Sequence, residues 1–243
     1  QSQMAAAPTA RVALVHAELE NARRQGAATA AAALDRYLAL SPAAGTVDLV
    51  VWPENAVNLL LEDNPELVAR IAARAGATPY VVGAPRTVAT GSGYTLRTSA
   101  LVIADGGLAR SYDKRRLLPF AETRPSLRGR DAAQPQIFLP GTAATVVTVG
   151  RLRLGPLICY EAIFPELART TVRAGAELLV NLSNDSWFPP GAGPAQHARF
   201  AALRAVELRR DRVERVAAGV GDVEDAVGPE REPTRIGERH ARE

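Results

Sequence analysis

Short apolar runs alternate with amphipathic stretches along most of this chain. The run "VDLVVWPE" (47–54) is short and almost continuously apolar, which is typical of a strand buried on both faces. The segment 64–76 instead repeats apolar residues at helical spacing. Asn64 is a suitable N-cap, Pro65 suits the first turn and Gly76 suits the C-terminal end. The pattern therefore predicts strands that alternate with helices.

The same pattern assigns the rest of the chain. We expect strands at 11–16, 47–54, 79–85, 99–105 and 177–185, two strands meeting near Gly150 within 144–161, and helices at 20–40, 64–76, 164–176 and 194–210. In the last helix Phe200, Leu203 and Val206 lie about one turn apart, which predicts an apolar face. The alternation favours an α/β fold whose strand ends carry the functional residues.

Composition limits the domain count. The chain has 243 residues, 47% of them hydrophobic, which suffices for one sizeable core. Residues 211–243 differ, with 15 charged residues among 33 and no aromatic residue. Such a segment buries little surface, so we expect the chain to be loosely held or disordered from about residue 211.

Several classes of protein are disfavoured. The arginines are scattered and interspersed with acidic residues, which argues against nucleic-acid binding. No apolar run approaches the roughly 18 residues that span a bilayer, so we expect no transmembrane segment in this chain. The single cysteine, Cys159, excludes an internal disulfide and a cysteine-rich zinc site. His16 and His197 have no second ligand at metal spacing, so we expect no metal and treat His197 as a structural or helix-surface residue. Without a phosphate-binding or dinucleotide motif, we also expect no cofactor.

Three residues at the ends of predicted strands carry the candidate chemistry. Glu54 ends one strand, Cys159 ends another, and Lys114 is the one lysine among 29 basic residues. Read separately, the cysteine could be a small buried hydrophobe and the glutamate a solvated strand end. Read together, Glu54 could take the thiol proton and the Lys114 ammonium could stabilise an oxyanion. The backbone N–H of Tyr160 would be a second oxyanion donor. This combination predicts acyl transfer through a thioester.

These residues lie in motifs that resemble a known family. "VVWPEN", "SYDKRRLLPFAE", "LGPLICYEAIFPE" and "LLVNLSNDSWF" followed by "QHARFAALRAVELRRD" resemble the nitrilase (carbon–nitrogen hydrolase) superfamily. The resemblance implies an αββα sandwich and a Glu54–Lys114–Cys159 triad. It also implies supporting roles for Glu122, Tyr160 and Glu161. The candidates for the pocket are Trp52, Asn184, Asp185, Trp187 and Phe188.

Within that superfamily the motifs look like the apolipoprotein N-acyltransferase branch. The resemblance implies that a phospholipid donates an acyl chain to the cysteine, and that the chain then passes to the N-terminal diacylglyceryl-cysteine of a lipoprotein. It implies a domain on the extracytoplasmic side of the bacterial inner membrane, held there by a portion absent from this chain. We assign residues 1–228 to the catalytic domain and 229–243 to a charged, disordered tail with an atypical sequence.

Two other functions stay open at this point. A soluble amidase or nitrilase would use the same triad with water in place of the amine. A truncated, inactive domain would explain the unusual C-terminal sequence. Arg115 and Arg116, beside the lysine, are interpreted as surface charges or as contacts to anionic headgroups.

Overall fold

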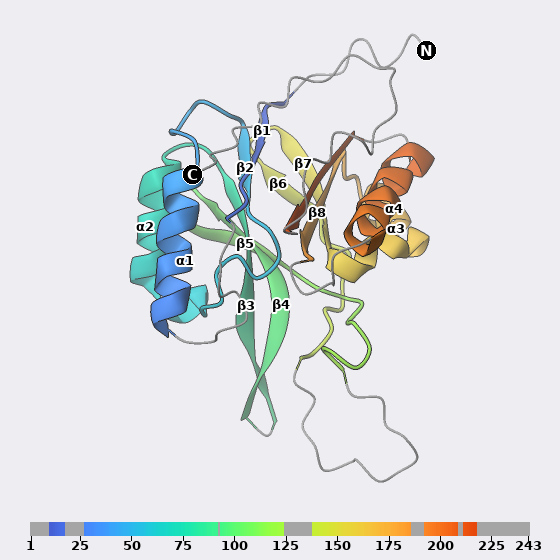
Figure 1. The fold of residues 1–243 in the computed structure, drawn as a ribbon, viewed down its shortest axis with the longest axis horizontal. Coiled ribbons are helices and arrows are strands. Elements are labelled where there is room, and N and C mark those ends of the chain that lie inside the picture. The colour runs from blue at the N-terminus through green and yellow to red at the C-terminus, as the bar shows by residue number, and fades with distance from the viewer. Residues whose placement is uncertain are drawn as a thin grey trace.

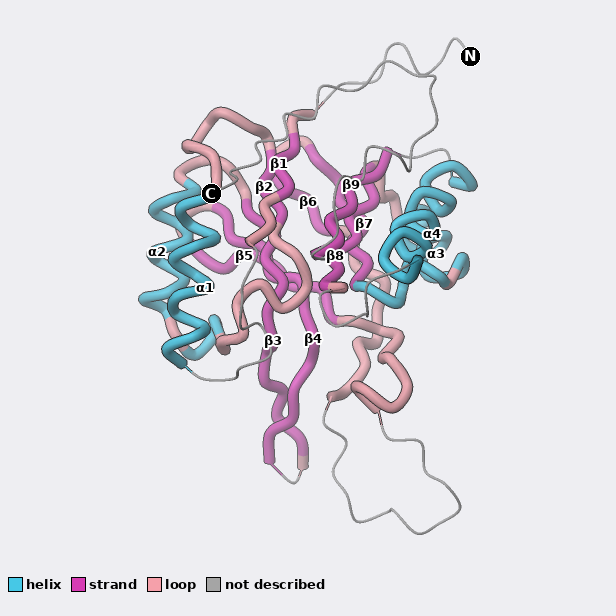
Figure 2. The backbone as a smooth tube through the Cα atoms, viewed as in Figure 1, coloured by secondary structure: helices cyan, strands magenta, loops and turns pink. Residues whose placement is uncertain are grey.

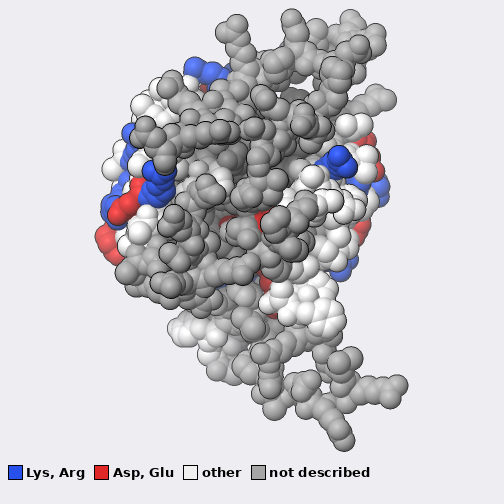
Figure 3. All heavy atoms as spheres, viewed as in Figure 1, with Lys and Arg blue, Asp and Glu red and all other residues white. Residues whose placement is uncertain are grey.

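The protein has four layers, two sheets packed face to face between two pairs of helices (Figure 1). The computed structural model describes residues 10–17, 27–91, 93–123, 138–185, 192–208 and 211–217, with the side chains of 27–29 and 211–217 left aside. Charged side chains of the described residues gather on the two flanks, over the helical layers (Figure 3). The order of the layers, helices, sheet, sheet and helices, confirms the predicted αββα sandwich.

The first sheet has the strand order β1-β2-β3-β4-β5. Its strands are β1 (Val12–Leu14), β2 (Leu49–Val51), β3 (Tyr80–Thr90), β4 (Gly93–Ala104) and β5 (Gly107–Asp113). The first three are parallel and the last three are antiparallel. The hairpin of β3 and β4 extends beyond the body of the sheet (Figure 2). The parallel part brings the carboxyl ends of β1 and β2 to the same edge.

The second sheet has the order β6-β7-β8-β9. Its strands are β6 (Val147–Val149), β7 (Leu152–Ile158), β8 (Leu178–Asn184) and β9 (Asp211–Ala217). The hairpin of β6 and β7 turns at Gly150, as predicted, where φ is +54°. Strands β7, β8 and β9 are parallel, so Cys159 and Asp185 follow neighbouring strands at one edge of the sheet.

The helices cover the outer faces of the two sheets (Figure 1). They are α1 (Ala27–Leu40) and α2 (Pro65–Ala75) on the first sheet, and α3 (Pro165–Arg173) and α4 (Ala192–Leu208) on the second. There are also two short 3₁₀ turns. The turn η1 (Leu61–Asp63) lies between β2 and α2, and the turn η2 (Cys159–Ile163) directly follows β7. Among the described residues no helix combines the length and apolar character needed to cross a membrane.

Alternation along the strands separates three apolar layers. In β2, Val50 faces the α1–α2 layer, whereas Leu49 and Val51 belong to the layer between the sheets. A smaller cluster beneath α3 includes Leu157 and Leu179. Because each strand contributes to two layers, nearly continuous apolar runs are needed, which is why the sequence made these strands recognisable.

Three expectations about elements are wrong. Residues 107–113 form β5, for which no strand was predicted, because β4 supplies an antiparallel partner. Residues 211–217 form β9 despite their charge, since backbone pairing with β8 needs no apolar side chain. In α4 the expected face is exposed, with Leu203 at 45% and Val206 at 74%. The buried face of α4 instead includes His197, Ala201 and Ala205.

Candidate active site

Glu54 and Lys114 form a buried ion pair at the edge of the first sheet. Glu54 follows β2, Lys114 follows β5, and the Lys114 Nζ donates to the Glu54 Oε1 at 2.8 Å. Only 5% of Glu54 and 1% of Lys114 are exposed. Burial of a single charge would be expensive, so each group requires the other. A glutamate buried at a strand end needs a cation beside it, and Lys114 supplies that cation.

Glu122 adds a second carboxylate to the same ammonium. Its Oε2 lies 3.0 Å from the Lys114 Nζ, and its Oε1 accepts from the Thr98 hydroxyl at 3.1 Å. Burial alone would lower the pKa of Lys114, but the charges of Glu54, Cys159 and Glu122 outweigh it and raise that pKa above its ordinary value. Lys114 is therefore a fixed cation at neutral pH.

Cys159 begins η2 directly after β7, with a left-handed backbone at φ +51°. Non-glycine residues rarely adopt this conformation, and where they do it is a frequent mark of functional turns. Burial raises the pKa of the thiol, and Glu54 raises it further. Lys114 and a hydrogen bond with Ser183 oppose this without cancelling it. The raised pKa favours the thiol form of Cys159 over the thiolate.

The raised pKa gives a pH prediction. Iodoacetamide should alkylate Cys159 at a rate that still rises above the pH of about 8.5 where an ordinary cysteine is half ionised. Glu54→Gln should move the profile to lower pH, because it removes a negative neighbour and frees the Lys114 ammonium. Alkylation rates from pH 6 to 11, read by mass spectrometry, test both statements. A wild-type midpoint at or below that of a free thiol would contradict them.

Two glycines permit the close backbone contacts that place the ion pair. A Cβ on Gly83, in β3, would lie 2.0 Å from the Pro53 carbonyl oxygen and 2.7 Å from the Glu54 Cα. A Cβ on Gly141 would lie 2.3 Å from the Asp113 carbonyl oxygen, next to Lys114. These are contacts that no side chain tolerates, so the backbones around both charges depend on glycine.

Gly83→Ala should therefore displace Glu54. We expect thioester formation on Cys159 to slow by about 100-fold, the cost that a displacement of about 1 Å can have at a reacting centre. Gly91→Ala, at the tip of the same hairpin, is the matched control because its added Cβ would meet nothing within 4 Å. Equal acylation rates for the two variants would show that Gly83 does not place Glu54.

A second polar network lies beside Cys159, at the edge of the second sheet. The Ser183 hydroxyl, in β8, lies 2.9 Å from the Asp185 Oδ1, and the His197 Nδ1 lies 3.0 Å from the same oxygen. Sequence reasoning placed Asp185 in the pocket but assigned His197 to a structural or surface position. The structure rules out the surface position and is compatible with the structural one, because α4 presents His197 inward against Asp185. Its partner Asp185 follows β8, whereas His197 lies in α4, so the spacing within one helix or one strand does not link the two residues.

Glu161 is a structural anchor. Its two oxygens accept from the backbone N–H groups of Ile158, Arg115 and Arg116, at 2.8, 2.6 and 3.1 Å. The Tyr112 hydroxyl also donates to it at 2.7 Å. Burial raises the pKa of Glu161 above its ordinary value, and these donors oppose the rise without cancelling it. Glu161 thus ties the segment after Lys114 to the turn that carries Cys159.

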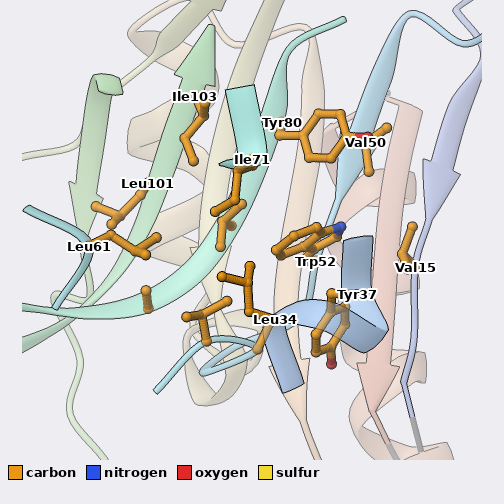
Figure 4. Close-up of a cluster of buried hydrophobic side chains, with 14 of the residues drawn as sticks. Val15, Leu34, Tyr37, Val50, Trp52, Leu61, Ile71, Tyr80, Leu101 and Ile103 are labelled. Atoms are coloured by element: carbon orange, nitrogen blue, oxygen red, sulfur yellow. The ribbon is translucent and has the colours of Figure 1, made fainter. Parts of the chain in front are cut away.

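Some predicted pocket residues lie elsewhere. Trp52 is a correction, because it is fully buried under α1, packed between Tyr37 and Tyr80, and donates to the Ser41 hydroxyl at 3.0 Å (Figure 4). Alternation explains this, since the residue after Val51 faces the helices and not the site. Tyr160 packs edge-on against Phe164.

The remaining pocket candidates stay predictions. Asn184 ends β8 and is half-buried. Trp187 and Phe188 lie outside the described residues, and their assignment stays a prediction.

The two arginines beside Lys114 differ from each other. Arg115 was interpreted as a surface or headgroup contact, but its guanidinium donates to the Tyr112 hydroxyl, the Leu167 carbonyl and the Thr171 hydroxyl. It therefore fastens this loop to α3. Arg116 is exposed, lies 3.8 Å from Glu166 and stacks on the Phe164 ring.

The sandwich fold and the match to a family model together define a class of protein. Residues 11–210 match the family described as carbon-nitrogen hydrolase, and the chain belongs to this family. Its fold is similar to that of a carbon-nitrogen hydrolase from Helicobacter pylori, with a TM-score of 0.60, 19% identity, and coverage of 88% of this chain and 76% of the other. Saccharomyces cerevisiae Nit3, of the nitrilase superfamily, gives 0.59 at 20% identity, with coverage of 85% and 74%.

Relatives at higher identity share one description. The chain is 38% identical to the apolipoprotein N-acyltransferase of Geobacter metallireducens over 195 residues, which is 76% of this chain and 37% of the relative. It is 34% identical to that of Rhizobium meliloti over 239 residues, which is 91% of this chain and 45% of the relative. The chain thus spans less than half the length of these relatives.

Proposed function

We propose that this chain is the catalytic domain of an apolipoprotein N-acyltransferase that works through a thioester on Cys159. The observation that carries the proposal is the buried Glu54–Lys114 pair, with Glu122 behind it and Cys159 within its electrostatic reach. The relatives named apolipoprotein N-acyltransferase support the choice of acyl transfer over other reactions of the family. The fold neighbours, all near 20% identity, support the architecture alone.

The first half-reaction would transfer an acyl chain from a phospholipid. Glu54 accepts the thiol proton as the Cys159 Sγ attacks the ester carbonyl carbon. The Lys114 ammonium and the Tyr160 backbone N–H are the donors proposed for the oxyanion. The carbon–oxygen bond then breaks, the departing lysophospholipid oxygen takes the proton from Glu54, and Cys159 is left as a thioester.

The second half-reaction would consume an amine. The α-amino group of a diacylglyceryl-cysteine attacks the thioester carbonyl carbon, and Glu54 accepts one amine proton. The carbon–sulfur bond breaks, the thiolate takes that proton back, and an amide is released. Ester plus amine thus becomes amide plus lysophospholipid, with the enzyme restored. Glu122 would act on this cycle through Lys114, by holding the ammonium when Glu54 is protonated.

The substrates would place this domain at a membrane surface. We propose that it lies on the extracytoplasmic side of the inner membrane. We also propose that the membrane portion corresponds to the part of the relatives that this chain does not match. A phospholipid donor and a lipoprotein N-terminus are the proposed partners.

An acceptor competition tests the proposal. The chain is incubated in detergent micelles with a phospholipid that carries an alkyne-labelled acyl chain, and a diacylglyceryl-cysteine peptide is then added. We expect the label first on Cys159 and then on the peptide amine, where it resists hydroxylamine. Labelled free fatty acid as the main product, with turnover of small amides, would favour a hydrolase. A folded chain that takes up no label would favour an inactive domain.

A further inference from the structure

The nucleophile has two potential metal ligands beside it. The Cys159 sulfur, an Asp185 carboxylate oxygen and a His197 ring nitrogen all lie within 4.8 Å of one another, and all three residues are buried. They come from three separate elements, η2, the end of β8 and α4. We propose that these residues form a zinc-binding site, at which Zn²⁺ binds the nucleophilic sulfur and reversibly blocks it.

The donor set suits zinc. Thiolate, imidazole and carboxylate are the three protein ligands of Zn²⁺, with bond lengths of about 2.0 to 2.3 Å and tetrahedral geometry. Ligand atoms of such a site lie about 3.3 to 3.7 Å apart, so a small contraction of the cluster suffices. The thiolate also selects Zn²⁺ over Mg²⁺ and Ca²⁺, which prefer sites made of oxygen atoms alone.

The charge around the cluster also favours a dication. The site holds the buried carboxylates of Glu54 and Asp185 and the half-buried carboxylate of Glu122, with Lys114 as the cation that pairs with Glu54 and Glu122. With His197 neutral and the thiol protonated, the ionised groups sum to −2. Lys114 lies between Glu54 and Glu122, so its charge is already compensated. Ionisation of Cys159 adds a further negative charge, which a divalent cation on the sulfur would offset.

Binding would exchange a proton for the metal. The S–H bond of Cys159 breaks, a Zn–S bond forms and the proton leaves to solvent, so affinity rises with pH. The titratable groups that face the sulfur are Glu54, Lys114, Asp185 and His197. Ser183 would orient the Asp185 carboxylate through the hydrogen bond already present at 2.9 Å. No change of oxidation state is involved.

Cobalt reports this site without any acyl substrate. The full chain, freed of metal with a chelator, is titrated with Co²⁺. We expect a thiolate-to-cobalt charge-transfer band and the visible bands of tetrahedral Co²⁺, with one-to-one stoichiometry and displacement by Zn²⁺. Zn²⁺ should also slow the alkylation of Cys159 by iodoacetamide at least tenfold, and a chelator should restore it.

Variants identify the ligands. Asp185→Asn and His197→Gln should each raise the zinc concentration for half-protection by about tenfold or more, and Cys159→Ser should remove the charge-transfer band. His16→Gln, a histidine outside the cluster, is the matched control and should bind as the wild type does. If a variant does not fold, the wild-type cobalt spectrum and the protection of Cys159 decide the matter.

Two results would overturn the zinc site. One is a wild-type alkylation rate that saturating Zn²⁺ leaves unchanged, and the other is a His197→Gln or Asp185→Asn variant that binds as tightly as the wild type. The site does not depend on the proposed reaction. A chain that binds Co²⁺ through Cys159 but never forms a thioester would refute only the proposed function, and the converse would refute only the zinc site.

Discussion

Lys114→Arg is expected to slow thioester formation on Cys159 by at least about 100-fold, the cost of losing one preorganised oxyanion donor. We expect the variant to keep a cooperative thermal transition. The measurement is the rate of hydroxylamine-sensitive acylation from labelled phospholipid, with the melting curve followed by circular dichroism.

The reason is the shape of the cation. The Lys114 ammonium donates to Glu54 at 2.8 Å and to Glu122 at 3.1 Å, which leaves a third proton for a developing oxyanion. A guanidinium is planar and wider, and it favours bidentate pairing with one carboxylate. Arginine would therefore keep the charge but direct its donors at Glu54 or Glu122. Every other basic residue of the chain, apart from histidine, is an arginine. The composition therefore gives no other reason for this one lysine.

Arg116→Lys is the matched control, since it exchanges the same two residue types two positions along the chain at an exposed site. We expect it to acylate at the wild-type rate. Near-normal acylation of Lys114→Arg would instead show that any cation serves at this position and would remove Lys114 from the oxyanion site.

Glu161→Gln is expected to lower the free energy of unfolding by about 3 kcal/mol or more, because hydrogen bonds to a buried charged group contribute about 1.5 to 3 kcal/mol each. Glu161 accepts from four donors through two oxygens. Glutamine keeps one acceptor and turns an N–H₂ group toward the other donors, which leaves buried N–H groups unpaired. For a chain of this size we expect the melting temperature to fall by about 10 °C.

Glu166→Gln provides the comparison for that prediction. Glu166 is exposed on α3, and its ion pair with Arg116 is 3.8 Å long, so its loss should change stability by less than about 0.5 kcal/mol. Chemical denaturation of the two variants gives the difference. Equal stability of Glu161→Gln and the wild type would show that the Glu161 carboxylate does not hold the turn η2, which carries Cys159, in place.

The sequence was informative where a residue's role depends on its own strand. Glu54 and Cys159 follow apolar runs, so their position at strand ends could be read directly, and the buried charge of Glu54 required a cation. The strand pairs around Gly150 and the parallel strands were likewise visible, because two packed faces demand continuous apolar residues. Motif resemblance supplied Glu122, which now contacts Lys114.

Other features depend on how the elements pack against one another, which a single segment of sequence does not reveal. His197 became part of the site only because α4 packs behind β8, and the apolar residues Leu203 and Val206 misled the choice of buried face. Trp52 was wrongly assigned to the pocket, because successive residues of a strand face opposite sides of the sheet and Trp52 faces the helices. Strand β9 was missed because its charged sequence contains no apolar run, although its backbone pairs with β8 along its length.

The most direct measurement is the intact mass of the wild-type chain and of Cys159→Ser after incubation with a phospholipid of defined acyl composition. We expect the wild type to gain the mass of one fatty acid less one water, at Cys159 and removable by neutral hydroxylamine, and Cys159→Ser to gain nothing that hydroxylamine removes. An acyl group on another residue of the folded wild type, or unchanged mass, would contradict a thioester at this site.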